Sequence, residues 1–188
     1  MSTVNGGNVR KGMFVLHHNE PHQVISHEFV SPGKGSAFTR VKLRNVLTSK
    51  MMDFTYKTTE QVELAEVETR ELQYIYQEGN NFVFMNPRTY DQVEVSGEVM
   101  GSDHNFLKEE MICHVQFYND QPIGIFLPKK VTLEVTEAEE AVAGDRVTAP
   151  KKQAKLETGA TIAVPIFVKT GDKVVIDTST GEYVSRNN

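Results

Sequence analysis

The stretch Ser31-Pro32-Gly33-Lys34-Gly35-Ser36, followed by AFTRVKLRNVL over residues 37–47, carries the strongest structural signal in the chain. From residue 37 onward apolar and basic side chains alternate, which is typical of a half-buried strand. Residues 23–30 are also strand-like, so the two segments predict a hairpin. Pro-Gly favours a type II turn, in which Gly33 takes a positive φ. Lys34 is then expected at the hairpin tip, between two glycines that leave the backbone bare.

The alternation assigns the side chains of residues 38–47 to two faces. The face expected in the core carries Val41, Leu43 and Leu47, and the opposite face carries Phe38, Arg40, Lys42 and Arg44. Alternate residues of a strand lie about 6.6 Å apart, close to the spacing of successive phosphates. The three cations alone are slightly better interpreted as a solvated barrel face, and Lys34 alone as an ordinary solvated lysine. Taken together, they favour contact with an RNA backbone.

The period of two recurs along the rest of the chain, and turn-forming residues interrupt it at close intervals. Strand-like alternation covers residues 71–77, 113–117 and 174–177, and turns follow at residues 78–81, 119–120, 171–172 and 180–181. Residues 59–70 fit a helix and a strand equally well, and residues 103–111 suit one helical turn. Short strands with frequent turns predict an all-β protein of small barrels.

Charge divides the chain into three segments. The 188 residues carry a formal net charge of -5, which taken alone argues against a nucleic-acid-binding protein. Residues 1–64 hold 8 Lys and Arg against 5 Asp and Glu, residues 65–128 hold 3 against 11, and residues 129–188 hold 9 against 9. Each segment has the size of one small barrel. We therefore expect three domains with these boundaries, and the cationic excess lies in the domain of Lys34.

Other residues point away from catalysis and from membranes. No run of 18 apolar residues predicts a membrane span, and the single cysteine, Cys113, excludes an internal disulfide and fits a reducing cytoplasm. Cys113 and His114 lie on opposite faces of a predicted strand, so a buried thiol is expected instead of a nucleophile pair.

Four histidines cluster in the first domain but predict no metal site. His17, His18, His22 and His27 match no metal-ligand spacing, and we expect them on surface loops. Motifs for a phosphate-binding loop, a serine nucleophile or a metalloprotease are absent from the sequence. We therefore expect neither an enzyme nor a bound metal.

These residues resemble the signature of the bacterial elongation factor P family. Residues 32–38, PGKGSAF, and residues 40–48, RVKLRNVLT, carry the resemblance most clearly. Further motifs follow in the family's order at residues 71–76, 82–86, 89–92, 164–168, 171–173 and 181–186. The resemblance therefore covers nearly the whole chain.

The resemblance implies an SH3-like (KOW-like) N-terminal barrel followed by two OB folds, in an L-shaped, tRNA-like arrangement. It implies a factor that binds the 70S ribosome between the peptidyl-tRNA and exit sites and relieves stalling at consecutive prolines. Lys34, held by Pro32, Gly33 and Gly35, would position the CCA end of the peptidyl-tRNA, and in many relatives this lysine is extended after translation.

The implied partners are ribosomal RNA, peptidyl-tRNA, mRNA at the exit site and an enzyme that modifies Lys34. The protein is expected as a cytoplasmic monomer, with no cofactor besides a covalent extension of Lys34. Family loops that lie near the exit-site codon often begin Gly-Asp-Thr, and here Gly144 and Asp145 match whereas Arg146 replaces Thr. An arginine there would suit a phosphate. Tyr183 and Arg186 match the family's C-terminal signature and imply further RNA contacts.

Two other functions stay open at this point. A general single-stranded RNA-binding protein of OB folds would need exposed aromatic residues beside basic ones, and the acidic middle segment disfavours it. A purely protein-binding scaffold would make the Lys34 loop incidental. Crosslinking from Lys34 separates the three functions, because it reports a tRNA or ribosomal RNA end, scattered RNA, or protein only.

Overall fold

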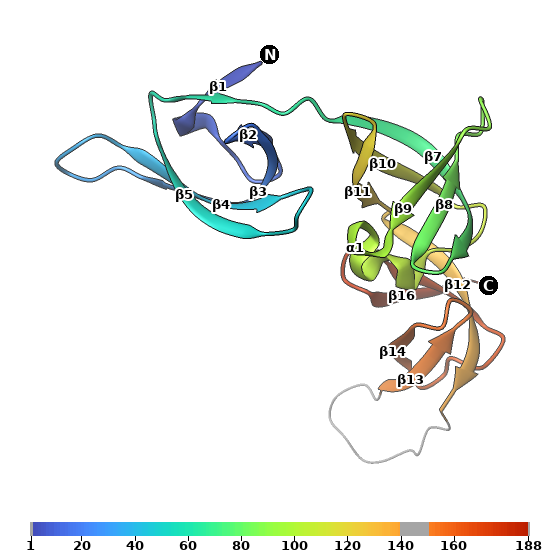
Figure 1. The fold of residues 1–188 in the computed structure, drawn as a ribbon. Helices are drawn as coiled ribbons and strands as arrows, with labels where there is room; N and C mark the ends of the chain where they lie inside the picture. Colours follow the sequence, from blue (N-terminus) through green and yellow to red (C-terminus); the bar gives the residue numbers. More distant parts are fainter. Residues whose placement is uncertain (1, 140–150, 188) are drawn as a thin grey trace. The chain divides into compact units, whose positions relative to one another are not determined.

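A computed structural model describes residues 2–139 and 151–187 of the chain. Strands dominate these ranges, and three short helical segments interrupt them (Figure 1). The chain forms two compact units, residues 1–70 with 115–124 and residues 71–114 with 125–188. The prediction of an all-β, multi-domain protein is confirmed.

The N-terminal residues form a four-stranded antiparallel sheet in the order β2-β3-β4-β5 and a separate pair, β1-β6. Their bounds are β1 Thr3–Asn5, η1 Gly6–Asn8, β2 Phe14–His17, β3 Glu20–Val30, β4 Phe38–Asn45, β5 Met51–Lys57 and β6 Gln61–Glu63. The register of β4 places Val41 beside Phe54 and Leu43 beside Met52 of β5. Neighbouring side chains on one face of the sheet thereby form a continuous apolar layer.

The alternation predicted for β4 is confirmed, with one exception. Val41 and Leu43 are 3% and 0% exposed and pack with Val9, Val15 and Val24. Leu47, predicted on the same face, is 42% exposed. The strand ends at Asn45, whose Oδ1 accepts hydrogen bonds from the backbone N–H groups of residues 47 and 48 at 2.9 and 3.0 Å. This side-chain turn takes the chain out of the sheet before residue 47 reaches the core.

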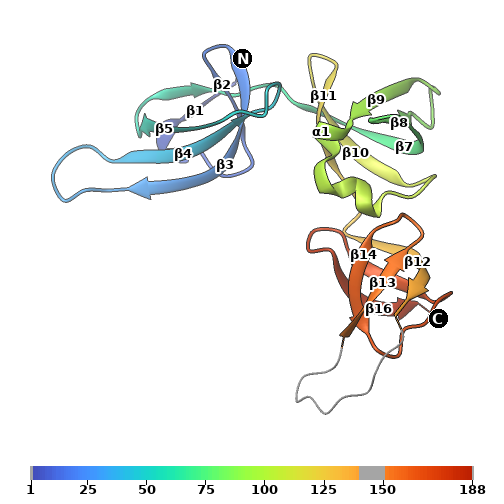
Figure 2. The ribbon, with the colours of Figure 1, turned by 60° about the horizontal axis from the view of Figure 1, so that its bottom comes forward.

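The hairpin of β3 and β4 has a loop that extends beyond the strands of its sheet (Figure 2). Its connection, residues 31–37, is longer than the turn expected at Pro32-Gly33. The positive φ occurs at Gly35, at 108°, and Gly33 has no positive φ, so the type II turn prediction is wrong. In this longer loop the unusual backbone conformation falls where the chain returns to β4.

Residues 59–70 form no helix. Val62 of β6 pairs with Val4 of β1 and is 3% exposed, so tertiary packing selects the strand. The helical turn predicted within residues 103–111 is confirmed by η2, Gly101–Phe106, which starts two residues earlier than expected. It follows α1, Gly97–Met100, whose N-cap residue Ser96 accepts the N–H of Val99.

The middle strands form a five-stranded sheet in the order β11-β10-β7-β8-β9. Their bounds are β7 Glu68–Glu78, β8 Asn81–Met85, β9 Gln92–Ser96, β10 Ile112–Tyr118 and β11 Gln121–Phe126. The predicted hairpin turns are confirmed, because Gly79 has φ 59° and Asn119 and Asp120 have φ 49° and 60°. Two successive positive φ values fit the type I′ turns that join twisted strands.

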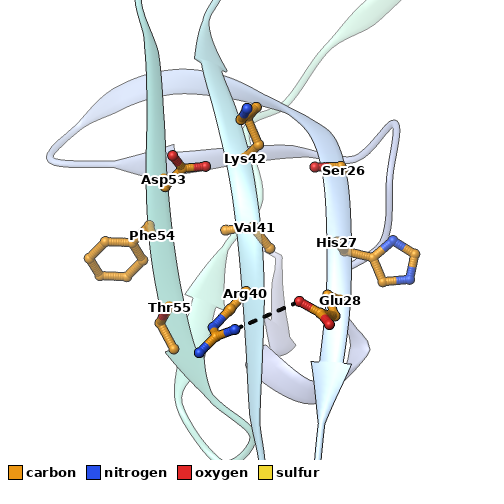
Figure 3. Close-up of a pocket in the computed structure, with 9 residues that line it drawn as sticks. All are labelled: Ser26, His27, Glu28, Arg40, Val41, Lys42, Asp53, Phe54 and Thr55. Carbon is orange, nitrogen blue, oxygen red and sulfur yellow. Dashed lines mark ion pairs between the residues drawn. The ribbon is translucent and has the colours of Figure 1, made fainter.

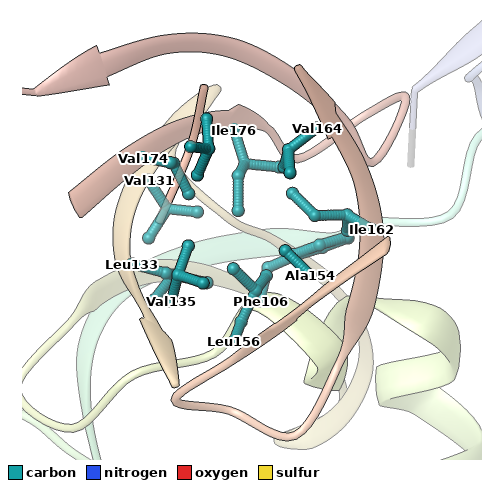
Figure 4. Packing of buried hydrophobic residues seen from close by; sticks show 11 residues of the cluster. Phe106, Val131, Leu133, Val135, Ala154, Leu156, Ile162, Val164, Val174 and Ile176 are labelled. Atoms are coloured by element: carbon teal, nitrogen blue, oxygen red, sulfur yellow. The ribbon is translucent and has the colours of Figure 1, made fainter. Parts of the chain in front are cut away.

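The C-terminal strands form a second five-stranded sheet, in the order β14-β13-β12-β15-β16. Their bounds are β12 Lys130–Ala138, β13 Lys151–Leu156, β14 Thr161–Pro165, β15 Lys173–Asp177 and β16 Glu182–Asn187. Alternate residues of these strands, such as Leu133, Val164 and Val174, are fully buried together (Figure 4).

One member of this C-terminal core comes from an earlier part of the chain. Phe106, the last residue of η2, is 9% exposed and belongs to the same cluster (Figure 4). Two polar contacts lie close by: Thr158 Oγ1 donates to the carbonyl of Asn105 at 2.6 Å, and Lys108 Nζ lies 2.9 Å from Glu157 Oε1. The segment around residue 106 is therefore bound to the C-terminal sheet by apolar and polar contacts.

Among the described residues, no helix is long and apolar enough to cross a membrane.

Candidate nucleic-acid interface

The Lys34 loop presents an exposed ammonium group at the end of a long hairpin. Residues 33–36 are exposed and Pro32 is half-buried. Lys34 makes no hydrogen bond or ion pair with any described residue. Space around Gly33 is open, with no atom within 4 Å of the position of an added Cβ. The loop is thus bare enough for another backbone to approach it closely.

The basic face of β4 lies where the alternation predicted it. Arg40 and Lys42 are exposed and Arg44 is half-buried, all on the side away from the core. Phe38 shares this side, and the Arg40 guanidinium lies 5.4 Å from the centre of its ring. Phe38 therefore already packs against a cation of its own strand.

Acidic and neutral residues of the neighbouring strands flank this basic face. The register places Arg40 between Glu28 and Thr55, and Lys42 between Ser26 and Asp53 (Figure 3). Arg40 Nη1 lies 3.9 Å from Glu28 Oε2, with both side chains well exposed. Arg44 donates a hydrogen bond to Gln23 Oε1 at 3.0 Å. These neighbours reduce the positive potential of the face, which no pattern within β4 alone could reveal.

A shallow cleft of about 500 Å³ runs across this part of the sheet. Its walls include Ser26 and Glu28 from β3, Lys42 from β4 and Asp53 from β5 (Figure 3). Its mixture of charges suits a polar partner more than an apolar one.

The prediction of surface loops is confirmed only for His18, because His27, although exposed, lies in β3. His17 and His22 lie in strands and are 8% and 4% exposed, whereas His18 and His27 are exposed. The His17 ring packs edge-on against Phe54, with ring centres 4.4 Å apart. Its Nε2 is buried without a hydrogen-bond partner in the described part of the chain. The spacing of the histidines could not reveal this burial, because His17 packs against Phe54, a residue of the distant strand β5.

Burial lowers the pKa of His17, and the nearby His18 and His22 lower it further. Within residues 2–139 and 151–187, no three His, Cys, Asp or Glu side chains group in a way that could hold a metal ion. The cluster is thus an aromatic part of the core with a neutral imidazole at its centre.

Cys113 is buried and His114 exposed, as their alternation predicted. Burial raises the pKa of the Cys113 thiol to about 12, so it stays protonated at neutral pH. This thiol is a core side chain.

The two C-terminal candidates differ in their surroundings. Tyr183 is half-buried and packs against the C-terminal core. Arg186 is exposed; its Nη1 lies 3.6 Å from Asp172 Oδ2 and its guanidinium 5.7 Å from the centre of the Phe167 ring. Gly144, Asp145 and Arg146 lie outside the described residues.

Comparison with known proteins gives a consistent result over the whole chain. Residues 5–62 match the family model "Elongation factor P (EF-P) KOW-like domain", residues 67–125 the "Elongation factor P (EF-P) OB domain" and residues 131–186 "Elongation factor P, C-terminal". The chain is 42% identical over 180 residues to elongation factor P of Persephonella marina, covering 96% of this chain and 95% of that protein. It is 47% identical over 178 residues to that of Aquifex aeolicus, covering 95% and 93%.

A solved structure supports the fold. The eukaryotic translation initiation factor 5A from Methanococcus jannaschii superposes with a TM-score of 0.52 at 22% identity, covering 67% of this chain and 94% of that one. The KOW-like and OB domains, with this likeness of fold, define a β-barrel translation factor. Within that class, the chain belongs to the elongation factor P family.

Proposed function

We propose that this protein binds the 70S ribosome between the peptidyl-tRNA and exit sites and speeds peptide-bond formation at consecutive prolines. The observation that carries the proposal is Lys34, a lysine without an intramolecular partner in the described structure, at the tip of an extended hairpin. Its ammonium group is free to meet the phosphates and sugars at the CCA end of the peptidyl-tRNA.

The proposed mechanism requires only that the positive charge of Lys34 be held in position beside the tRNA end. The ring of proline fixes φ and constrains the approach of the reacting groups. A misplacement near 1 Å can cost about 10²-fold in rate. A cation that holds the tRNA end in register restores this rate without an acid, a base or a nucleophile of its own. This agrees with a protonated, buried Cys113 and with relatives named as translation factors.

Removal of the Lys34 amine tests the proposal directly. Lys34→Ala should abolish the acceleration of Pro-Pro-Pro peptide synthesis on purified ribosomes while leaving the thermal unfolding midpoint unchanged, because the side chain is exposed and makes no hydrogen bond or ion pair with a described residue. Lys34→Arg is the matched control: it keeps the charge but changes the shape of the head group. An alanine variant that accelerates synthesis at the normal rate would refute the proposal.

We also propose that an enzyme extends Lys34 covalently, because the exposed loop leaves the amine accessible. Peptide mass spectrometry of natively expressed protein measures the extension. Fully active native protein with unmodified Lys34 would remove the extension from the mechanism.

Further RNA contacts are proposed for the C-terminal part. Arg186 is exposed and suits a phosphate, whereas Tyr183 is half-buried and offers only part of its ring. Gly144, Asp145 and Arg146 are proposed to lie near mRNA at the exit site. Ribosome footprinting with Arg186→Gln and Arg146→Gln tests the two contacts separately.

A general single-stranded RNA-binding function receives less support. In the middle sheet, Arg70 lies over the ring of Phe117 at 4.4 Å, but its guanidinium is also bonded to Glu68 and Asp120 at 2.7 and 2.6 Å. The negative charges of Glu68 and Asp120 offset the charge of Arg70 and disfavour a phosphate there. This aromatic–cation pair is therefore a poor platform for bases.

A further inference from the structure

The Lys34 hairpin has a second cleft at its root, on the side opposite to the basic face of β4. The cleft measures about 520 Å³, within the usual range for small-ligand sites. Phe29 of β3, Arg10, Asn5, Asn8 and Thr58 contribute to its walls. It lies entirely within the N-terminal residues.

The strand register explains why an aromatic ring is exposed here. Phe29 pairs with Thr39, which pairs with Tyr56, and these two partners are 0% and 4% exposed. Phe29 therefore points to the core side of the sheet. It is nevertheless 54% exposed, because β2 pairs with β3 only over residues 20–23 and leaves this end of β3 at the edge of the sheet. Part of the Phe29 ring is therefore accessible to a ligand.

Arg10 is held in a defined position at the same cleft. Its Nη1 donates hydrogen bonds to the carbonyls of Gly7 and Val9 at 2.8 and 2.9 Å. Its Nε and Nη2 make no hydrogen bond with a described residue, so they remain as donors. The next residue, Lys11, is a second cation. Its backbone N–H donates a hydrogen bond to His27 Nδ1 at 3.2 Å.

The chemistry of the walls indicates the class of ligand. No carboxylate lines this cleft, in contrast to the cleft on the outer face, where Glu28 and Asp53 stand beside the cations. One guanidinium, two amides, a hydroxyl and an aromatic ring match the parts of a nucleotide. In nucleotide sites an aromatic ring stacks on the base, amides read its edge and a guanidinium meets the phosphate.

We propose that this cleft binds one nucleotide of single-stranded RNA while Lys34 reaches the tRNA end. The proposal rests on the proposed ribosomal function and adds a binding site to it. It adds Phe29 and Arg10 to the RNA contacts proposed for Arg40 and Lys42.

Substitution of Phe29 tests the stacking contact, with ribosome affinity measured by co-sedimentation of the full chain. Stacking of one base on an aromatic ring corresponds to about a 5- to 150-fold change in affinity. Phe29→Ala should therefore weaken binding about tenfold, and Phe29→Trp should retain it. Phe126→Ala is the matched control, because Phe126 is also 54% exposed but lies at the end of β11.

A photoreactive phenylalanine at position 29 identifies the partner in the same complex. We expect a crosslink to RNA at position 29 and none at position 126. A crosslink to protein, or a Phe29→Ala variant that binds as tightly as the parent chain, would refute nucleotide binding in this cleft. Neither result would affect the proposal for Lys34. A parent chain that does not sediment with ribosomes would overturn the proposed function, and the cleft with it.

Discussion

At the scale of single residues, Gly33 and Gly35 of the Lys34 loop differ in backbone conformation. Gly35 has φ 108°, a conformation that side chains with a Cβ rarely adopt, whereas Gly33 is without a positive φ and faces open space. The glycine that shapes the loop therefore follows the lysine. We propose that Gly33 keeps the surface beside Lys34 free for a partner, because no atom lies within 4 Å of an added Cβ there.

The two glycines should respond differently to alanine. Gly35→Ala makes the present loop conformation less favourable by about 1–2 kcal/mol and should lower its population, and with it the rate of Pro-Pro-Pro synthesis, by at most about 5- to 30-fold. Gly33→Ala should stay within about twofold of the parent rate unless its methyl group meets the bound RNA. The rate of tripeptide formation on purified ribosomes measures both. A larger loss for Gly33→Ala than for Gly35→Ala would show that close approach of RNA matters more than loop shape.

His17 makes stability depend on pH. Its pKa is lowered in the folded chain, mainly by burial, so the unfolded chain binds more protons at mildly acidic pH. Stability should therefore fall as pH drops from the unfolded pKa of about 6.5 towards the folded one. His17→Phe should remove this fall in urea unfolding between pH 7.5 and 5, and His114→Phe, at an exposed position, should not. An unchanged pH slope in His17→Phe would assign the effect to other groups.

At the scale of elements, two short segments matter more than their length suggests. Strand β4 separates core residues from cations through its alternation alone, but β3 and β5 decide how much of the positive charge remains. The six-residue helix η2 provides Phe106 to the C-terminal core. A Cβ on Gly181 would lie only 3.3 Å from the Phe106 ring, so this residue is closely covered.

Phe106 should contribute strongly to the stability of the C-terminal core. Phe106→Ala removes a ring that is 9% exposed and should lower the free energy of unfolding by about 3 kcal/mol, because a cavity remains. Calorimetry should show an earlier transition for this part of the chain. Phe126→Ala, at a ring 54% exposed, should change stability by less than about 0.5 kcal/mol. Equal effects of the two substitutions would contradict the role assigned to η2.

At the scale of the whole molecule, net charge conceals the distribution that matters. The chain is acidic, at -5, yet residues 1–64 hold three more cations than acids. The acidic excess lies in residues 65–128, which we propose face solvent or basic ribosomal proteins. An average over the chain thus hides the cationic excess of its first segment.

Charge reversal tests this distribution. Arg40→Glu with Lys42→Glu should weaken ribosome binding far more than Glu66→Lys with Glu78→Lys, which reverse exposed acids of the acidic segment. Conversely, Glu28→Gln with Asp53→Asn should strengthen binding, because these acids offset the neighbouring cations. Affinities at two salt concentrations measure both effects. Equal losses from the two reversals would count against the division.

Local pattern predicted the strands, most turns and the position of Lys34, because side-chain alternation and turn chemistry depend on residues close together in the chain. Burial of His17 and His22 and the neighbours of Arg40 and Lys42 were decided by strands distant in sequence. So were the uncovered ring of Phe29 and the insertion of Phe106 into the C-terminal core. Such features depend on which surfaces are brought together in three dimensions, and only the tertiary structure determines that.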